Sequence, residues 1–217
     1  MKTKQPKDYF AETFPLKTLW IDGCEISYEQ TGSSLYEQLS SKDKDAFPSL
    51  LEEVQIRPKS AYEQVLKWKD KYPRVPEFDN LLTYVYLQNK QTDKAEKLIE
   101  ESFHKYPNYF FAKINYADQV LRQKNVDTFK EIFPSFALKE LFPKRKTFHV
   151  SEFRGFMVTI SHYYLLKEER DKAKEYYQKA FQADPAHPSV IFLEKKLFPV
   201  FFLKKIWKRI LKLARIS

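Results

Sequence analysis

Within residues 77–107, apolar side chains recur every three or four positions on both sides of a short polar stretch, 89–93. This spacing is that of two helices, each with one buried face, and Thr92 or Asp93 is placed to cap the second helix. Neither helix can bury its apolar face alone. The pattern therefore predicts a helix pair with further pairs stacked on both sides of it.

An earlier pair is predicted from the repeat of a Lys-Tyr-Pro sequence. Pro73 lies 34 residues before Pro107, and both close a stretch with helical spacing. The first helix of this pair is expected over residues 46–56, with Pro48 near its first turn, where proline is tolerated. The second helix is expected to start at a Ser60 cap.

Two later pairs are predicted. A third pair begins at Tyr109, and Pro134 cuts its second helix short. A helical segment over 135–142 and a basic loop follow. A fourth pair runs from Ser151 to Pro185 and has regular helical spacing throughout.

The register of large and small residues within the pairs is the more specific signal. In the second and fourth pairs the shared positions hold Leu82, Tyr86, Ala95, Ile99 and Pro107, and Ile160, Tyr164, Ala173, Tyr177, Ala180 and Pro185. This register resembles the tetratricopeptide-repeat family, although Thr83 and Ser161 stand where the family has a glycine. The resemblance implies an all-α, tetratricopeptide-like solenoid of antiparallel helix pairs. Three alanines, at positions 95, 173 and 180, are expected at close helix contacts.

The resemblance also implies a function. Family members hold peptides or partner proteins on a concave face built from the first helix of each pair, so the chain is predicted to be a non-catalytic scaffold or adaptor. Projecting the groove positions of the family onto this chain gives Asn80, Tyr84, Gln88, Asn115, Asp118, Arg122 and His162. The basic cluster with which some members hold a C-terminal carboxylate is missing here. A polar peptide or another protein is therefore the expected partner; alternatively, these residues are only solvated.

The start of the chain follows a different pattern. Residues 1–18 are polar and broken by prolines, and Asp22-Gly23 then lies between two β-prone runs, which predicts a tight hairpin. Together with the pairs, this predicts three parts. They are a lead with a hairpin and a short helix (1–45), a repeat domain (46–194) and a basic amphipathic helix (195–217).

Charge changes the picture at the C-terminal end only. The formal net charge is +9, and residues 195–217 hold eight of the 38 basic residues and none of the 29 acidic ones. The other 30 basic residues nearly balance the acidic ones. A nearly neutral body has no general attraction for a polyanion, so a nucleic acid is an unlikely partner.

The basic segment has two clear faces when it is drawn as a helix. Apolar side chains, Trp207 among them, fill one arc about 160° wide, and lysines and arginines fill the opposite side. One interpretation is a capping helix for the repeats; the other is contact with an anionic membrane surface. An acidic partner of the kind bound by basic amphipathic helices ranks behind both. The residues expected at the membrane are Leu203, Lys204, Lys205, Ile206, Trp207, Lys208, Arg209, Ile210 and Lys212.

Candidate catalytic chemistry is sparse. Cys24 has no His or basic residue nearby in sequence to lower its pKa, which favours a small half-buried residue over a reactive thiol. His149 and Glu152 could offer two metal ligands, but one such pair is more typical of surface polar residues. No catalytic residue, metal or cofactor is predicted, and an enzyme accessory domain is kept only as an alternative.

The location is expected to be cytoplasmic. No apolar run follows the basic first residues, so a signal peptide is not expected, and no stretch is long and apolar enough to span a bilayer. If the basic segment contacts lipid, the protein is expected at the inner face of the membrane.

Overall fold

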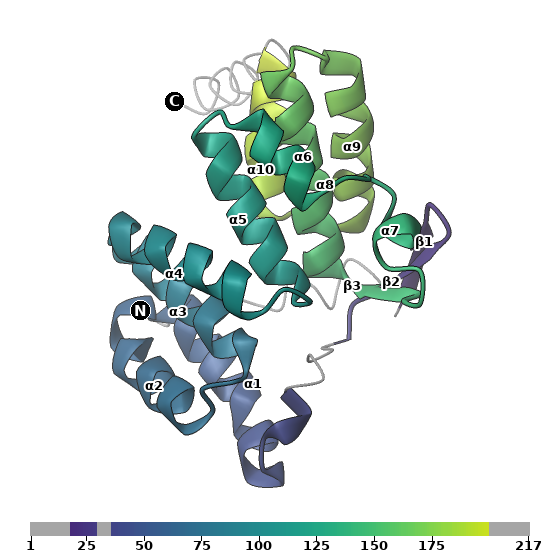
Figure 1. Cartoon of the computed structure of the whole chain (residues 1–217). Helices are drawn as coiled ribbons and strands as arrows, with labels where there is room; N and C mark the ends of the chain where they lie inside the picture. Colours follow the sequence, from purple (N-terminus) through teal and green to yellow (C-terminus); the bar gives the residue numbers. More distant parts are fainter. Residues whose placement is uncertain (1–17, 30–35, 200–217) are drawn as a thin grey trace, which may run out of the picture. The chain divides into compact units, whose positions relative to one another are not determined.

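The computed structural model describes residues 18–29 and 36–199, and these residues form two compact units. The first, here the helical unit, comprises residues 36–134 and 162–169 (Figure 1). The second, here the mixed unit, comprises residues 18–29, 135–161 and 170–199. The boundary between them falls inside one long helix, between Ser161 and His162.

The helical unit contains three consecutive helix pairs behind a short 3₁₀ turn. Its elements are η1 (Tyr36–Gln38), α1 (Ser41–Ile56), α2 (Pro58–Lys71), α3 (Pro76–Gln88), α4 (Thr92–Lys105), α5 (Phe110–Arg122) and α6 (Val126–Ile132). Each helix packs against the next, so that α3 lies between α2 and α4, and α5 contacts both α4 and α6. Pairs of antiparallel helices are therefore confirmed, with Ala95 of α4 fully buried as expected.

Aromatic residues form much of the core at the first two pairs. Phe78 of α3 is fully buried, and the rings of Phe47, Trp68 and Tyr72 surround it at centroid distances of 5.8, 5.5 and 6.1 Å. Asp79, the next residue, is also buried, and its carboxylate lies 2.6 Å from Lys69 Nζ on α2. The aromatic cluster and an ion pair between Lys69 and the buried Asp79 carboxylate therefore join α2 to α3.

Three expected helix starts are wrong. Helix α1 begins at Ser41 rather than Ala46, because Ser40 caps it by accepting a hydrogen bond from the Asp43 backbone N–H at 3.2 Å; Pro48 consequently lies inside the helix. Helix α2 begins at Pro58, whose fixed φ suits a first position, so Ser60 is not its cap. Helix α4 has Gln91 at its cap position without a side-chain hydrogen bond, so neither Thr92 nor Asp93 caps it.

The mixed unit combines a small sheet with the last helices. Its elements are β1 (Thr18–Ile21), β2 (Cys24–Ser27), α7 (Leu138–Leu141), β3 (Thr147–His149), α8 (Val150–Leu166, of which the part up to Ser161 belongs here), α9 (Arg170–Ala183) and α10 (Pro188–Leu197). Strands β1 and β2 form the expected antiparallel hairpin. Asp22 and Gly23 at its turn have φ of 51° and 72°, the left-handed region that a tight hairpin turn requires.

Several features of the mixed unit differ from the sequence prediction. Strand β3, which pairs in parallel with β2, was not predicted, and its first residue, Thr147, was expected in the basic loop over 143–147. The helical segment expected over 135–142 is reduced to the four residues of α7. Helix α10, which packs against α9, was not predicted.

The expected all-α fold of tetratricopeptide-like helix pairs is nonetheless confirmed. Ala173 and Ala180 of α9 are fully buried, as their positions in the repeat predict. The division of the chain at residues 45 and 194 stays a prediction, and the basic helix expected over 195–217 lies almost wholly outside the described residues.

One buried ion pair holds the end of α9 in the mixed unit. Arg154 of α8 donates to the Asp184 carboxylate at 2.5 Å, and the two side chains are 14% and 3% exposed. Next to it, Tyr28, which follows β2, donates its hydroxyl to the Ala183 carbonyl at 2.7 Å. Two contacts from different elements therefore fix the same helix end.

Replacing Arg154 with methionine should lower the free energy of unfolding by about 3–5 kcal/mol, because the Asp184 carboxylate stays buried without its partner. Urea denaturation followed by circular dichroism measures this change. Adding Asp184→Asn should recover part of the loss. Lys174→Met, which breaks an exposed pair with Asp171, should change little; a comparable loss in that control would contradict the assignment.

Stability should also depend on the protonation of His187. Its Nδ1 accepts a hydrogen bond from the Ser189 backbone N–H at 3.2 Å and so caps α10. Burial, with Arg154 nearby, lowers the pKa of His187 to about 4. The unfolded chain takes up this proton near pH 6.5, so the native state loses stability as pH falls from about 6.5 to 4.

After allowance for partial exposure, this loss should be about 1–2 kcal/mol. His187→Asn keeps a capping acceptor but does not titrate, so the variant should lose less stability than the wild type between pH 7 and pH 4.5. Exposed His104, changed to Asn, serves as the matched control. Equal pH profiles for all three proteins would show that His187 is not responsible.

Candidate functional site

The residues projected onto a binding groove lie mainly on α3 and α5 of the helical unit. Asn80, Tyr84 and Gln88 follow one another at one-turn intervals along α3. On α5 the corresponding residues are Asn115, Asp118 and Arg122. His162 lies half-buried on α8, in the part of that helix that belongs to the same unit.

A hydrogen bond joins the two helices at this face. The Asn115 Nδ2 group donates to Asn80 Oδ1 at 2.8 Å. Below this pair is a small hollow of about 10 Å³, enough for one water molecule. The buried Ser102 hydroxyl of α4 lines the hollow and has no hydrogen-bond partner. We call the exposed surface of α3 and α5 around the asparagine pair the amide face.

Two apolar side chains are exposed on α3 beside this pair. Tyr84 is 38% exposed, and Leu87, three residues further on, is 41% exposed. Leu87 was not among the projected residues, although its i+3 spacing from Tyr84 places it on the same side of the helix. An amide pair next to exposed apolar groups can both form hydrogen bonds and bury surface.

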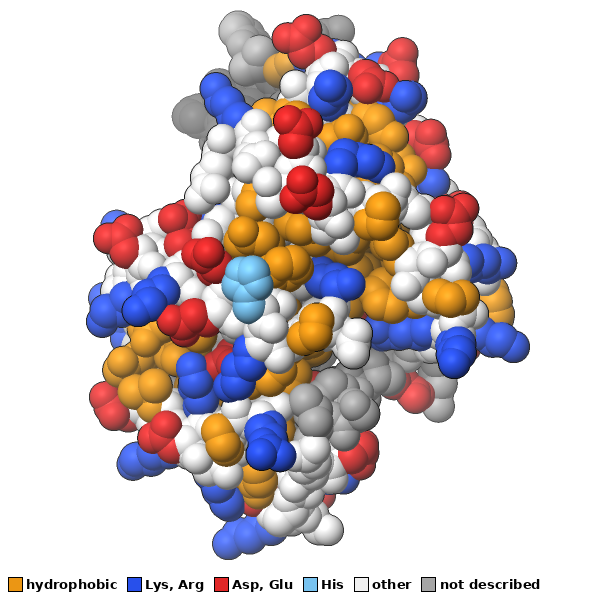
Figure 2. All heavy atoms as spheres, in the orientation of Figure 1, with side chains coloured by type: hydrophobic (Ala, Val, Ile, Leu, Met, Phe, Trp, Pro, Cys, Tyr) orange, Lys and Arg blue, Asp and Glu red, His pale blue; other side chains and the backbone are white. Residues whose placement is uncertain are grey.

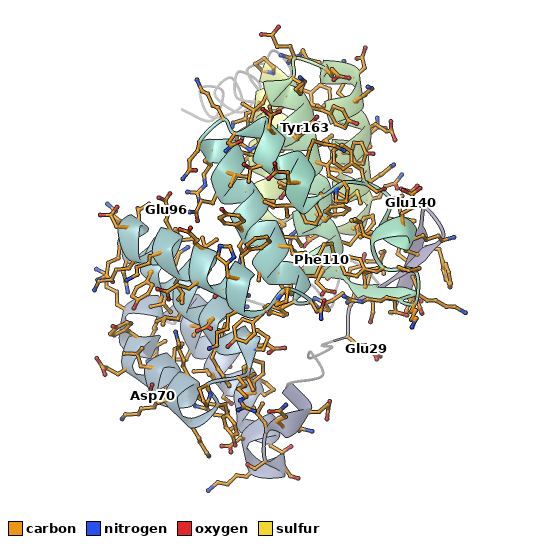
Figure 3. The ribbon with its side chains drawn as sticks, in the orientation of Figure 1. Glu29, Asp70, Glu96, Phe110, Glu140 and Tyr163 are labelled. Carbon is orange, nitrogen blue, oxygen red and sulfur yellow. The ribbon has the colours of Figure 1, made fainter. Side chains whose placement is uncertain are left out.

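The charged groups at the amide face are paired with one another. Arg122 Nε lies 3.2 Å from the Asp118 carboxylate, and its Nη1 lies 3.5 Å from Glu96, which Figure 3 labels. Acidic and basic side chains are also interspersed over the visible surface of the helical unit (Figure 2). A strongly charged ligand would therefore have to compete with existing ion pairs.

The two candidate reactive sites serve the structure instead. Cys24 is 2% exposed, and burial raises the pKa of its thiol. Glu152 accepts a hydrogen bond from the His149 backbone N–H at 3.0 Å and pairs with Arg145. The His149 Nδ1 accepts from the Ser151 backbone N–H at 3.3 Å. These groups hold the start of α8.

Two further kinds of site are not found among the described residues. Among them, no cluster of three or more His, Cys, Asp or Glu side chains could hold a metal ion. None of the helices in the described ranges has the length and apolar character that crossing a membrane requires. The nine residues expected to contact lipid, from Leu203 to Lys212, lie outside the described residues.

Comparison with known proteins places the repeat. Residues 156–187 match the family model described as tetratricopeptide repeat. This segment covers the second half of α8 and all of α9. No curated protein matches the chain.

Two solved structures of MamA also match the chain. "MamA RS-1 ArsTM double mutant" is 16% identical, with a TM-score of 0.44 over 81% of this chain and 96% of that one. "MamA 41-end from Desulfovibrio magneticus RS-1" is 15% identical, with a TM-score of 0.43 over 82% and 98%. Residues 156–187 are therefore similar to a tetratricopeptide repeat, and the helix pairs described above form a helical-repeat fold of that type.

Proposed function

We propose that the chain is a non-catalytic scaffold that binds a protein or peptide segment across the amide face. The observation that carries this proposal is the hydrogen bond between Asn80 and Asn115 next to exposed Tyr84 and Leu87. The pair ties two successive first helices together at a surface, and the adjacent apolar groups have no evident role in the core.

The chemistry of the asparagine pair suits a peptide backbone. An amide side chain has two donor hydrogens and one acceptor oxygen, and the mutual bond uses only one donor and one acceptor. The remaining groups are the NH₂ of Asn80 and the Oδ1 of Asn115. An extended peptide presents alternating N–H and C=O groups, so one peptide unit can pair with both.

The exposed apolar groups indicate which side chains of the partner segment would bind next to the asparagine pair. Tyr84 and Leu87 together offer a flat ring and a branched aliphatic group, and aromatic anchors of this kind commonly dominate binding energy at interfaces. Because Arg122 is already paired with Asp118 and Glu96, an uncharged partner segment with an aromatic or aliphatic side chain is favoured. An acidic segment would gain less.

Removing the side chain of Tyr84 should weaken partner binding about tenfold or more, because a central aromatic contact is lost. A photo-crosslinking amino acid at position 84 captures the partner in cells, and mass spectrometry identifies it. The affinity of that partner is then measured with Tyr84→Ala, Asn115→Ala and Leu87→Ala.

The matched control is Phe192→Ala, which removes an exposed aromatic ring from the mixed unit. This control should leave affinity unchanged. If Tyr84→Ala and Asn115→Ala both bind within twofold of the wild type, the partner does not use the amide face.

A second candidate function, docking on an anionic membrane surface, is favoured by one observation on α10. This helix leads into the basic segment and exposes Phe192 by 58% and Ile191 by 36%. Lys196 Nζ lies 4.7 Å above the Phe192 ring. Anionic lipid surfaces attract aromatic and aliphatic groups that lie beside lysine. On this chain such a combination is already present on α10, before the segment that starts at Leu203. We propose that α10 and this segment both contact the membrane, which would place the scaffold at its inner face.

The wild type should bind anionic vesicles at low salt and dissociate as salt rises, since each basic residue near the lipid contributes about 1 kcal/mol. Co-sedimentation measures the bound fraction. Lys204→Glu with Lys208→Glu should nearly abolish binding. Trp207→Ala should weaken binding without changing its dependence on salt.

The capping interpretation gives a different result. A chain ending after Pro199 keeps α10 whole, including buried Leu197. If that truncated chain melts well below the intact protein, and the intact protein ignores anionic vesicles at low salt, the segment is a cap. A truncated chain with unchanged melting and no vesicle binding supports docking.

A further inference from the structure

A cavity of about 390 Å³ lies within the mixed unit, apart from the amide face. It is bounded by the β1–β2 turn, by the segment that leads into α7, and by α8 and α9. Buried Phe153 and Met157 of α8 line it together with Cys24 of β2. Its volume is in the range of small-molecule sites, which begin near 300 Å³.

Two aromatic rings form another part of the cavity lining. Phe136 and Tyr176 stand edge to face, with ring centroids 6.1 Å apart. Aromatic edges and faces, together with the Met157 thioether, favour contact with another flat ring over a branched aliphatic group. The apolar part of the cavity is therefore suited to an aromatic ligand.

The two lysines that line the cavity differ in whether they form ion pairs. Lys179 Nζ lies 3.0 Å from the Asp22 carboxylate and 2.9 Å from that of Glu175, so it is already paired with two carboxylates. Lys139 also lines the cavity, but it forms no ion pair within the described part of the chain. The two lysines and the two carboxylates together carry no net charge, but the Lys139 ammonium group has no ion-pair partner among them and can pair with a ligand carboxylate.

The hairpin turn lies close to the end of the Lys139 side chain. A Cβ atom built on Gly23 would approach Lys139 Cε to 2.9 Å and would collide with Nζ. Gly23 also has a φ of 72°, which a residue with a side chain adopts only at a cost. The glycine thus serves the turn, and the Lys139 ammonium group lies next to it at the cavity.

We propose that this cavity binds a small aromatic carboxylic acid, with its ring against Phe136, Tyr176 and Met157 and its carboxylate on Lys139 Nζ. A carboxylate–ammonium hydrogen bond is stronger than one between neutral groups, so the charge should contribute to affinity as well as to orientation. The site is independent of the amide face, and a failure of one proposal leaves the other standing.

The chain offers a direct probe of this cavity, because it contains only two methionines, Met1 and Met157. Protein labelled with ¹³C at the methionine methyl groups gives two signals, and Met157→Leu assigns them with little change in volume. The probe ligand is 3-phenylpropionate, and its amide has the same ring without the charge. The acid should shift the Met157 signal by its ring current and saturate, while the Met1 signal stays in place.

Variants test the role of each part. Lys139→Ala should weaken binding of the acid about five- to tenfold and remove the preference for the acid over the amide. Lys144→Ala removes an exposed lysine of the same unit that does not line the cavity, and it should bind as the wild type does. Ala137→Trp, at the exposed edge of the cavity, should block both ligands.

Three results would overturn the proposal. One is an unmoved Met157 signal at millimolar acid in a folded protein. Another is equal affinity for acid and amide, or unchanged affinity in Lys139→Ala. The third is tighter binding at Met157 by a short peptide with a C-terminal phenylalanine, which would make the ligand a peptide end rather than a small acid.

Discussion

The mixed unit depends on one buried charge, the Asp184 carboxylate at the end of α9. Arg154 reaches it from α8, Tyr28 donates to the adjoining carbonyl, and His187, three residues later, caps α10. A buried carboxylate is costly unless it is paired, so only an arrangement that brings α8 to this helix end is stable. The end of β2, the end of α9 and the start of α10 all lie close to the Asp184 carboxylate and the Ala183 carbonyl. A purely apolar contact is not directional and would fix the positions of these helix and strand ends less precisely.

The helices of the repeated pairs could be predicted from sequence because of their periodic apolar faces, although the local start signals misplaced three of them. Alanines 95, 173 and 180 were assigned to close contacts because a repeat register predicts them, and all three are fully buried. Strand β3 could not be predicted in this way. Its partner residues, such as Glu25 for Thr147, lie far away in sequence, and three residues carry no period. Helix α10 did have a start signal, since Pro188 occupies a first helical position. The sequence prediction instead placed a helix over the basic residues 195–217.

The candidate sites show the same limit. The repeat register placed Asn80 and Asn115 on successive first helices, yet their mutual hydrogen bond and the orphan Ser102 hydroxyl below them are properties of packing. The register also assigned Arg122 to the groove without revealing its ion pair with Glu96 on α4. The cavity beside Lys139 was invisible, because a turn, a loop and two helices contribute its residues. No single stretch of sequence contains such a site.

The parallel pairing of β2 with β3 also affects the order in which the two units can fold during synthesis. Ser27 and His149 face each other in the sheet, so the hairpin emerges from the ribosome about 120 residues before its third strand. At ~5–20 residues per second, that interval lasts roughly 6–24 s. Residues 36–134, the bulk of the helical unit, are made within it and contain local contacts, which form quickly. The short hairpin is only marginally stable alone. The sheet of the mixed unit can therefore be completed only after β3 has been synthesised.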